Sequence, residues 1–321
     1  MTSGDAVLAA ASFKLNVLLP IVTGVLQGSI YGVIALGIVL LYKSNRIFNF
    51  AQGEFGTVAA VVANAGLAGS FFGWQMPYAV AMVVGLVAGV LTAVLTERLV
   101  IRPLFDRPKV TLTVATVGVA LLLIAVETLV VKQQKPFAGF STRVPALSKK
   151  PYWFALFGVS ITYEQVLCLV MLAILAVAAA LFFTKTNTGV AILAVSQEST
   201  ASSLVGISIG RISLVTWALA GLLGGIAGLL LSPITGLAGP GYVTGTALFT
   251  GITAAVLGGV TSLSGAFAGG IAIGVVQRLT NTGNLTAFGL PDIPGLDQVI
   301  VFLALLAVLL IRPQGLLGKE T

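Results

Sequence analysis

The sequence predicts an all-α membrane protein, a polytopic bundle of about eight to ten transmembrane helices, some of them broken or partial. Of the 321 residues, 57% are hydrophobic and only 8% are charged, whereas a soluble domain carries roughly 25% charged residues. The mean hydropathy is +1.07. Apolar stretches of about 20 residues, the length of a membrane-crossing helix, recur along the chain. We therefore expect one transmembrane domain over residues 1–321.

The composition argues against several other classes of protein. The chain has no His and a single Cys, so a zinc or haem site and a disulfide framework are not expected. The net charge is +7, but the basic residues are scattered in loops without interleaved aromatic residues, which argues against nucleic-acid binding. The N-terminus lacks the basic flank of a secretory signal, so the first apolar stretch reads as a retained span.

The candidate spans follow the apolar stretches in order. The first is overlong and interrupted by glycines, so it could tilt or break, and the last three are short. Two of the short ones are joined by a tight glycine-rich segment, so they are candidates for partial crossings that meet inside the protein. The candidate spans cover residues 15–42, 47–69, 77–101, 111–131, 161–184, 212–232, 244–260, 264–280 and 297–311.

The basic residues predict the orientation. Cytoplasmic loops carry an excess of Lys and Arg, and short loops show this bias best. The short loops at 43–46, 102–110 and 312–321 are basic. We therefore expect the N-terminus outside and the C-terminus in the cytoplasm.

Glycine pairs spaced by four residues recur in the apolar stretches. Such pairs let helix backbones approach closely in lipid. Each pair is compatible with packing inside the chain or with a seam that receives a partner subunit. The pairs are Gly24/Gly28, Gly28/Gly32, Gly85/Gly89, Gly221/Gly225, Gly224/Gly228, Gly265/Gly269 and Gly270/Gly274.

A polar segment lies at the start of the second stretch. In a continuous helix, Asn45, Asn49, Gln52 and Asn64 share one face. Polar groups inside a membrane are costly, so they normally face a helix seam or an aqueous path. Two interpretations stay open: a solute path, or a structural stripe of interhelical hydrogen bonds.

Glu54 does not fit that continuous helix, which would place it on the apolar side. A helix beginning near Gly53 would instead put Glu54 in the first turn, where the helix dipole favours a negative charge, and broken helices are common in transporter sites. Three roles remain open for Glu54: a structural cap, a partner for Arg46 or another basic residue, and a solute ligand.

The segment at about 185–210 is too polar to span. Residues 186–189 read as a turn or a helix-starting signal, residues 190–204 are compatible with a helix, and Gly206 reads as its stop. The helix would be amphipathic and short. It could dock on a cytosolic partner or lie on the lipid surface, although it lacks the basic face typical of the second case.

No enzyme active site is evident. The chain lacks the G-x-x-x-x-G-K-(S/T) loop that cradles phosphates, so any ATP would have to be hydrolysed by another subunit. No nucleophile–His pair is possible without His. The scattered carboxylates Glu54, Glu97, Glu127 and Glu164 are weak evidence for catalysis.

Four elements in order resemble the permease subunits of branched-chain amino-acid ABC importers, a family that includes urea and short-amide permeases. The run at 49–54 is similar to the family's N-F-A-(H/Q)-G-E element. The other three elements are G-V-L-Q-G-S-I-Y-G at 24–32, T-A-A-V-L-G-G at 253–259 with Gly265-Ala266, and R-P-Q-G-L-L-G at 312–318.

The resemblance implies a complex in a bacterial plasma membrane. Its other parts would be two ABC ATPases that bind ATP and Mg, a second homologous permease and an extracytoplasmic solute-binding protein, and this chain would bind no cofactor. The 185–210 segment would be the coupling loop, with contacts from Gln197, Glu198, Ser202 and Gly206. The resemblance also suggests that the solute passes along the interface between the two permeases, which fits the polar segment at Asn49 and Gln52. We expect the path to pass Asn45, Asn49, Gln52, Glu54 and Asn64.

The expected solute is a branched-chain amino acid. The alternatives are urea or short amides in the same family. An ion-coupled secondary transporter or a channel is an alternative of another class, and Glu54 is its one candidate for a coupling carboxylate.

Overall fold

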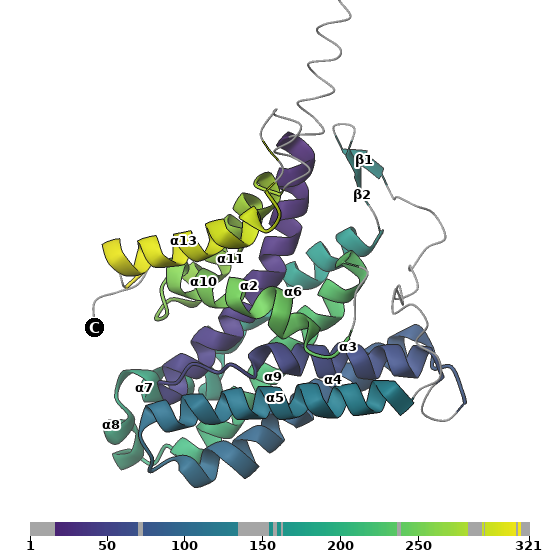
Figure 1. Cartoon of the computed structure of the whole chain (residues 1–321). Helices are drawn as coiled ribbons and strands as arrows, with labels where there is room; N and C mark the ends of the chain where they lie inside the picture. The colour runs from purple at the N-terminus through teal and green to yellow at the C-terminus, as the bar shows by residue number, and fades with distance from the viewer. Residues whose placement is uncertain are drawn as a thin grey trace, which may run out of the picture.

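The computed structural model describes residues 17–69, 73–133, 154–156, 159–161, 163–235, 239–281, 291, 293–312 and 314–315. These residues are almost entirely helical (Figure 1), which confirms the predicted fold class. One small antiparallel sheet pairs β1 (Phe154–Leu156) with β2 (Val159–Ile161). Residues 1–16 and 134–153 and the last part of the 312–318 motif lie outside the described residues.

Each predicted apolar stretch contains a helix in the structure. The helices are α2 (Leu19–Asn45), α3 (Gln52–Leu67), α4 (Tyr78–Thr96), η2 (Glu97–Ile101), η3 (Arg102–Leu104), α5 (Lys109–Gln133), α6 (Tyr163–Lys185), α7 (Asn187–Gln197), α8 (Ser199–Leu204), α9 (Ile209–Thr235), η4 (Thr244–Leu248), α10 (Phe249–Gly258), α11 (Leu263–Leu279) and α13 (Leu296–Ile311).

The helices differ in their ability to cross a membrane. In the described part of the chain, four are long and apolar enough: Leu19–Asn45, Tyr78–Leu104, Lys109–Leu129 and Ile209–Ser232. A fifth span results if α6 and α7, which meet at 75°, are counted as one broken span. The last three apolar helices are short, as predicted. The long first stretch forms a single helix, α2, despite its glycines.

Helix α2 passes through the middle of the molecule and packs most extensively against α11 (Figure 1). Gly28 lies at this contact. A Cβ atom there would lie 2.6 Å from the carbonyl oxygen of Gly270 and 2.8 Å from the Cα of Ile271. Only glycine permits this approach of two backbones. The pairs on α2 and α11 therefore serve packing inside the chain.

Helices α3, α4 and α9 form a second tightly packed group. Gly56 of α3 faces Gly224 and Gly228 of α9, and a Cβ at Gly56 would lie 2.6 Å from the Gly224 carbonyl oxygen. Gly85 and Gly89 of α4 lie against the backbone of α3. The contact between α2 and α9 joins this group to α2, α10 and α11.

Helix α5 lies at the edge of the molecule (Figure 1). Only 22% of the most apolar stretch of this helix is buried, compared with 89% of the corresponding stretch of α2. Its exposed side chains are apolar, among them Val110, Val114 and Leu121. Such a surface is typical of a helix that faces lipid.

Candidate transport and coupling site

The polar segment is a junction between two helices. Helix α2 ends at Asn45, and Arg46 adopts a left-handed conformation with φ of 55°. Helix α3 begins at Gln52, so Glu54 lies in its first turn. The continuous helix through Asn45 and Asn64 is therefore wrong, and the irregular entry is confirmed. Asn49 shapes this entry because its Oδ1 accepts a hydrogen bond from the Ala51 N–H at 3.0 Å.

Gln52 connects α3 to α9. Its side chain is fully buried, and its Nε2 donates to the carbonyl oxygen of Ala220 at 2.8 Å. Asn49 Nδ2 donates to Gln52 Oε1 at 3.4 Å. A Cβ at Gly37 of α2 would collide with the Gln52 side chain. Gln52 is thus held in a slot between α2 and α9 that glycines create.

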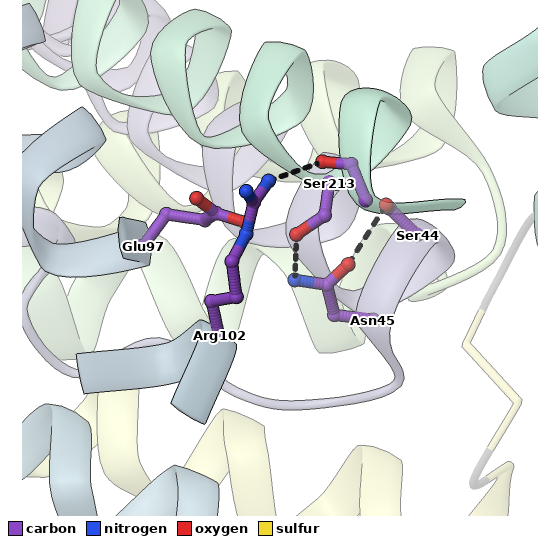
Figure 2. A network of polar contacts seen from close by, with 6 residues as sticks. Ser44, Asn45, Glu97, Arg102 and Ser213 are labelled. Carbon is purple, nitrogen blue, oxygen red and sulfur yellow. Dashed lines mark hydrogen bonds and ion pairs between the residues drawn. The ribbon is translucent and has the colours of Figure 1, made fainter. Parts of the chain in front are cut away.

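Asn45 connects the end of α2 to α9. Its Nδ2 donates to Ser213 Oγ at 3.3 Å, and its Oδ1 accepts from Ser44 Oγ at 2.9 Å. Figure 2 shows this link beside Glu97 and Arg102. Asn64, the last predicted residue, is buried in α3, and its Nδ2 has no hydrogen-bond partner among the described residues.

Glu97 and Arg102 form an ion pair with an Nε–Oε1 distance of 3.3 Å. Arg102 also donates through Nη2 to the carbonyl oxygen of Gly210 at 3.0 Å. Glu97 is fully buried, so the guanidinium offsets a charge that would otherwise be costly. The pair fixes η2 and η3, which follow α4, against the start of α9. Sequence reasoning treated Glu97 only as a scattered carboxylate, although a glutamate within an apolar stretch is itself a signal.

Glu54 is buried and has no basic partner among the described residues. The ion pair with Arg46 is not formed, because the Arg46 guanidinium donates to the carbonyl oxygen of Ser196 at 2.9 Å. The neighbours of the Glu54 carboxyl are Thr57, Thr244 and Glu127. The sequence did not suggest this grouping, since it draws on α3, α5 and η4.

A pocket of about 650 Å³ opens beside the end of α2. Its lining includes Asn45 and four cationic side chains, Lys43, Arg46, Arg102 and Lys109. Gln197 and Glu198 of the predicted coupling segment close another side. Lys43 is fixed by donation from Nζ to the carbonyl oxygen of Thr261 at 3.1 Å. The pocket therefore joins the polar junction to the coupling segment.

The coupling segment consists of two helices, not the single predicted one. Thr186 caps α7 by accepting from the Gly189 N–H at 3.0 Å, so residues 186–189 start a helix, the second of the two predicted possibilities. The break occurs at Glu198, which is extended and accepts from the Thr200 N–H at 3.2 Å. This side-chain cap starts α8 and explains the break. Ser202 Oγ donates to the Glu198 carbonyl oxygen at 2.7 Å, and Gly206 ends the segment with φ of 90°.

The tip of this segment is apolar and exposed. Leu204 and Val205 are 84% and 77% exposed. Helix α7 is anchored on its other side by the buried Ile192 and Val195. Figure 1 shows α7 and α8 together at one end of the molecule. The segment thus offers an apolar tip beside a basic pocket.

Comparison with known proteins gives a consistent result along the chain. The family model described as "Branched-chain amino acid transport system / permease component" matches residues 21–309. The chain is 26% identical over 306 residues to the high-affinity branched-chain amino acid transport system permease protein LivH of Escherichia coli, covering 92% of this chain and 94% of that protein.

Two further relatives extend this similarity. The chain is 29% identical over 313 residues to the permease protein BraD of Pseudomonas aeruginosa, covering 93% of this chain and 95% of that protein. It is 30% identical over 311 residues to a probable branched-chain amino acid transport permease protein LivH of Methanocaldococcus jannaschii, covering 92% and 91%.

A solved structure shares the fold. It is PsaBC from Streptococcus pneumoniae in complex with Fab, with a TM-score of 0.53 over 96% of this chain and 97% of that chain. The sequence identity is 13%, so the similarity concerns the arrangement of helices alone.

Proposed function

Because the chain belongs to the family of branched-chain amino acid transport permease components, we propose that it is the membrane-spanning subunit of an ATP-binding-cassette importer. The importer moves branched-chain amino acids across the plasma membrane with ATP that partner subunits hydrolyse. The observation that carries the proposal is the family match over residues 21–309. The chain also aligns with almost the whole length of relatives that are named branched-chain amino acid transport permeases. A solute-binding protein and a second homologous permease complete the complex.

In this proposal, α7 and α8 dock on an ATPase in the cytoplasm. The exposed Leu204 and Val205 support this, since apolar side chains outside the spanning helices favour a protein partner. The basic pocket beside Glu198 adds complementary charge for an acidic surface. The contacts come from Gln197, Glu198, Ser202 and Gly206. The ATPases bind ATP and Mg, this chain binds no cofactor, and the chain has its N-terminus outside and its C-terminus in the cytoplasm.

The solute path in this proposal follows the junction of α2 and α3. Asn45 supports it most directly, because this residue lines the pocket of about 650 Å³. Asn49, Gln52, Glu54 and Asn64 are buried and do not line this pocket. A polar route through a membrane requires groups of this kind. We propose that these four residues reach the solute when the helices rearrange during the transport cycle.

Reconstitution tests the function. The chain is purified in mild detergent with its proposed ATPases and second permease, placed in vesicles and supplied with the solute-binding protein. We expect ATP-dependent uptake of labelled leucine and much weaker uptake of labelled urea. Preferential uptake of urea would change the substrate, and uptake by the chain alone under an ion gradient without ATP would overturn the proposal.

Charge reversal at Glu198 tests the docking surface. We expect Glu198→Lys to lower the amount of co-purified ATPase about tenfold or more, while membrane insertion is unchanged. Lysine cannot accept the hydrogen bond from the Thr200 N–H that caps α8, and the loss of a helix cap costs about 0.5–2 kcal/mol. Asp106→Lys is the matched control, because Asp106 is exposed and does not line the pocket. Equal ATPase recovery with both variants would contradict this docking surface.

A further inference from the structure

Two glutamates from different helices face each other inside the membrane domain. Glu54 belongs to the first turn of α3, and Glu127 belongs to α5. They are 0% and 5% exposed. Their carboxyl groups lie within hydrogen-bonding reach of each other. The pair is therefore a direct polar contact between α3 and the edge helix α5.

The hydrogen-bond donors near this pair are all neutral: the Gly241 N–H beside Glu127, and the hydroxyls of Thr57 and Thr244 beside Glu54. Glu127 Oε2 accepts from the Gly241 N–H at 3.1 Å, but within the described part of the chain Glu127 Oε1 and both oxygens of Glu54 accept no hydrogen bond of good geometry. The Thr57 hydroxyl beside Glu54 donates to the Gly53 carbonyl oxygen at 3.3 Å and accepts from the Val243 N–H at 3.2 Å. In the described part of the chain, no lysine or arginine pairs with either carboxyl. Three buried carboxyl oxygens thus meet with no compensating charge.

Two negative charges in this position would be very unfavourable. Each buried carboxylate loses its hydration, and two like charges in contact repel strongly where the dielectric constant is low. Ionised carboxylates are also acceptors only, so two of them cannot form a hydrogen bond. One proton resolves all three problems, because it neutralises one group, which then donates to the other.

We infer that Glu54 and Glu127 share one proton and form an intramembrane proton-binding site. The bond is an O–H···O⁻ contact between the two side chains, of the strong charge-assisted class. Because Glu127 also holds Gly241, the site ties α3, α5 and the segment before η4 together. It goes beyond the proposed function, since ATP-driven import requires no proton site on this chain.

Infrared difference spectroscopy of the purified chain in lipid at neutral pH tests the inference. The wild type is compared with the double variant Glu54→Gln/Glu127→Gln. We expect the double variant to lose one protonated-carboxyl band, identified by its shift in D₂O, and one carboxylate band. The loss of two carboxylate bands, or of two protonated bands, would overturn the inference.

Glu97→Gln is the matched control. Glu97 is equally buried, but its counterion is Arg102, so this variant should lose a carboxylate band only. If the double variant does not fold, the single variants Glu54→Gln and Glu127→Gln are used. In each, the protonated band of the wild type should be lost or displaced, since its hydrogen-bond partner has changed. A band unaltered in both variants would overturn the inference.

A metal cation between the carboxylates is the competing outcome. It would leave both groups ionised, and the thermal midpoint of the wild type would rise with Na⁺ or K⁺ concentration. We expect no such rise when NaCl or KCl replaces choline chloride at constant ionic strength. A rise that is absent from the double variant would replace the proton with a cation.

Discussion

The seam between α2 and α11 and the contact between α3 and α5 hold helices together in opposite ways. At the seam, glycines bring two backbones so close that a Cβ at Gly28 would meet main-chain atoms of Gly270 and Ile271. At α5, much of the helix surface is exposed. There the contacts include polar ones: the Thr116 hydroxyl accepts from the Phe50 N–H at 3.0 Å, and Glu127 meets Glu54 and Gly241.

The difference shows what each contact can tolerate. Lipid tails are as apolar as leucine, so helices gain little by burying apolar side chains against each other. Close backbone packing is stabilised by many small dispersion contacts, and the two helices cannot move apart without losing them. A few hydrogen bonds can hold a loosely packed helix, and they can break and re-form. We therefore expect the seam to be rigid and α5 to be adjustable.

Gly28→Leu should have the largest effect. The new side chain must displace the backbone of α11, and overpacking alone costs about 1–3 kcal/mol or more even in adaptable cores. We expect little or no folded protein, measured by the monodisperse peak in size-exclusion chromatography. Gly118→Leu on α5 is the control, because a Cβ at Gly118 meets nothing within 4 Å. Equal recovery of the two variants would break the comparison.

Gln52→Leu should have the next largest effect, since it removes the hydrogen bond to Ala220 and leaves Asn49 Nδ2 without its acceptor. We expect a loss of about 1–3 kcal/mol, measured as a lower thermal midpoint. Gln298→Leu on the exposed side of α13 should leave the midpoint unchanged. If Gln52→Leu abolishes transport at an unchanged midpoint, Gln52 acts in the solute path and not as a link between α3 and α9.

Thr116→Val should have a smaller effect. It leaves the Phe50 N–H without an acceptor, at a cost of about 1 kcal/mol. We expect faster hydrogen exchange at the Phe50 amide in lipid, with the α2–α11 seam unaffected. Thr128→Val is the control, because the Thr128 hydroxyl donates only to Ile124 of its own helix. Exchange that rises equally in both variants would show that Thr116 does not anchor α5.

Gly118→Ala should have the smallest effect and the opposite sign. Alanine is up to about 1 kcal/mol more favourable than glycine inside a helix, and the site has room for it. We expect a slightly higher thermal midpoint. A decrease would mean that α5 is packed more tightly than its exposure indicates.

The sequence was a good guide to the helices and to their closest contacts. Apolar length alone located each spanning stretch, because lipid imposes it. The spacing of Gly24, Gly28 and Gly32 marked a helix-packing face, and the structure shows α11 as its partner. Which helix would fill that face depends on the whole bundle, so no local pattern could specify it.

The sequence was a poorer guide to the polar residues. The start of α3 at Gln52 was left open, since a continuous helix satisfied the same periodicity. The break at Glu198 was missed because the residues on both sides of it are compatible with one continuous helix, while Glu198 itself caps the second helix. The meeting of Glu54 and Glu127 joins positions far apart in the chain, and only the fold brings them together. Neither pattern nor resemblance determines the roles of Asn49, Gln52 and Asn64 in transport, which stay predictions.

The left-handed turn at Arg46 has a mechanical consequence. Among the described residues other than glycine, Arg46 alone has a positive φ. Its N–H closes α2 on the Tyr42 carbonyl oxygen at 2.8 Å, while its guanidinium holds the carbonyl oxygen of Ser196 in α7. Arg46 thus sets the angle at which the chain leaves α2 and also binds α7 through a hydrogen bond. A displacement of α7 is therefore expected to pull on Arg46 and to rotate the segment that joins α2 to α3.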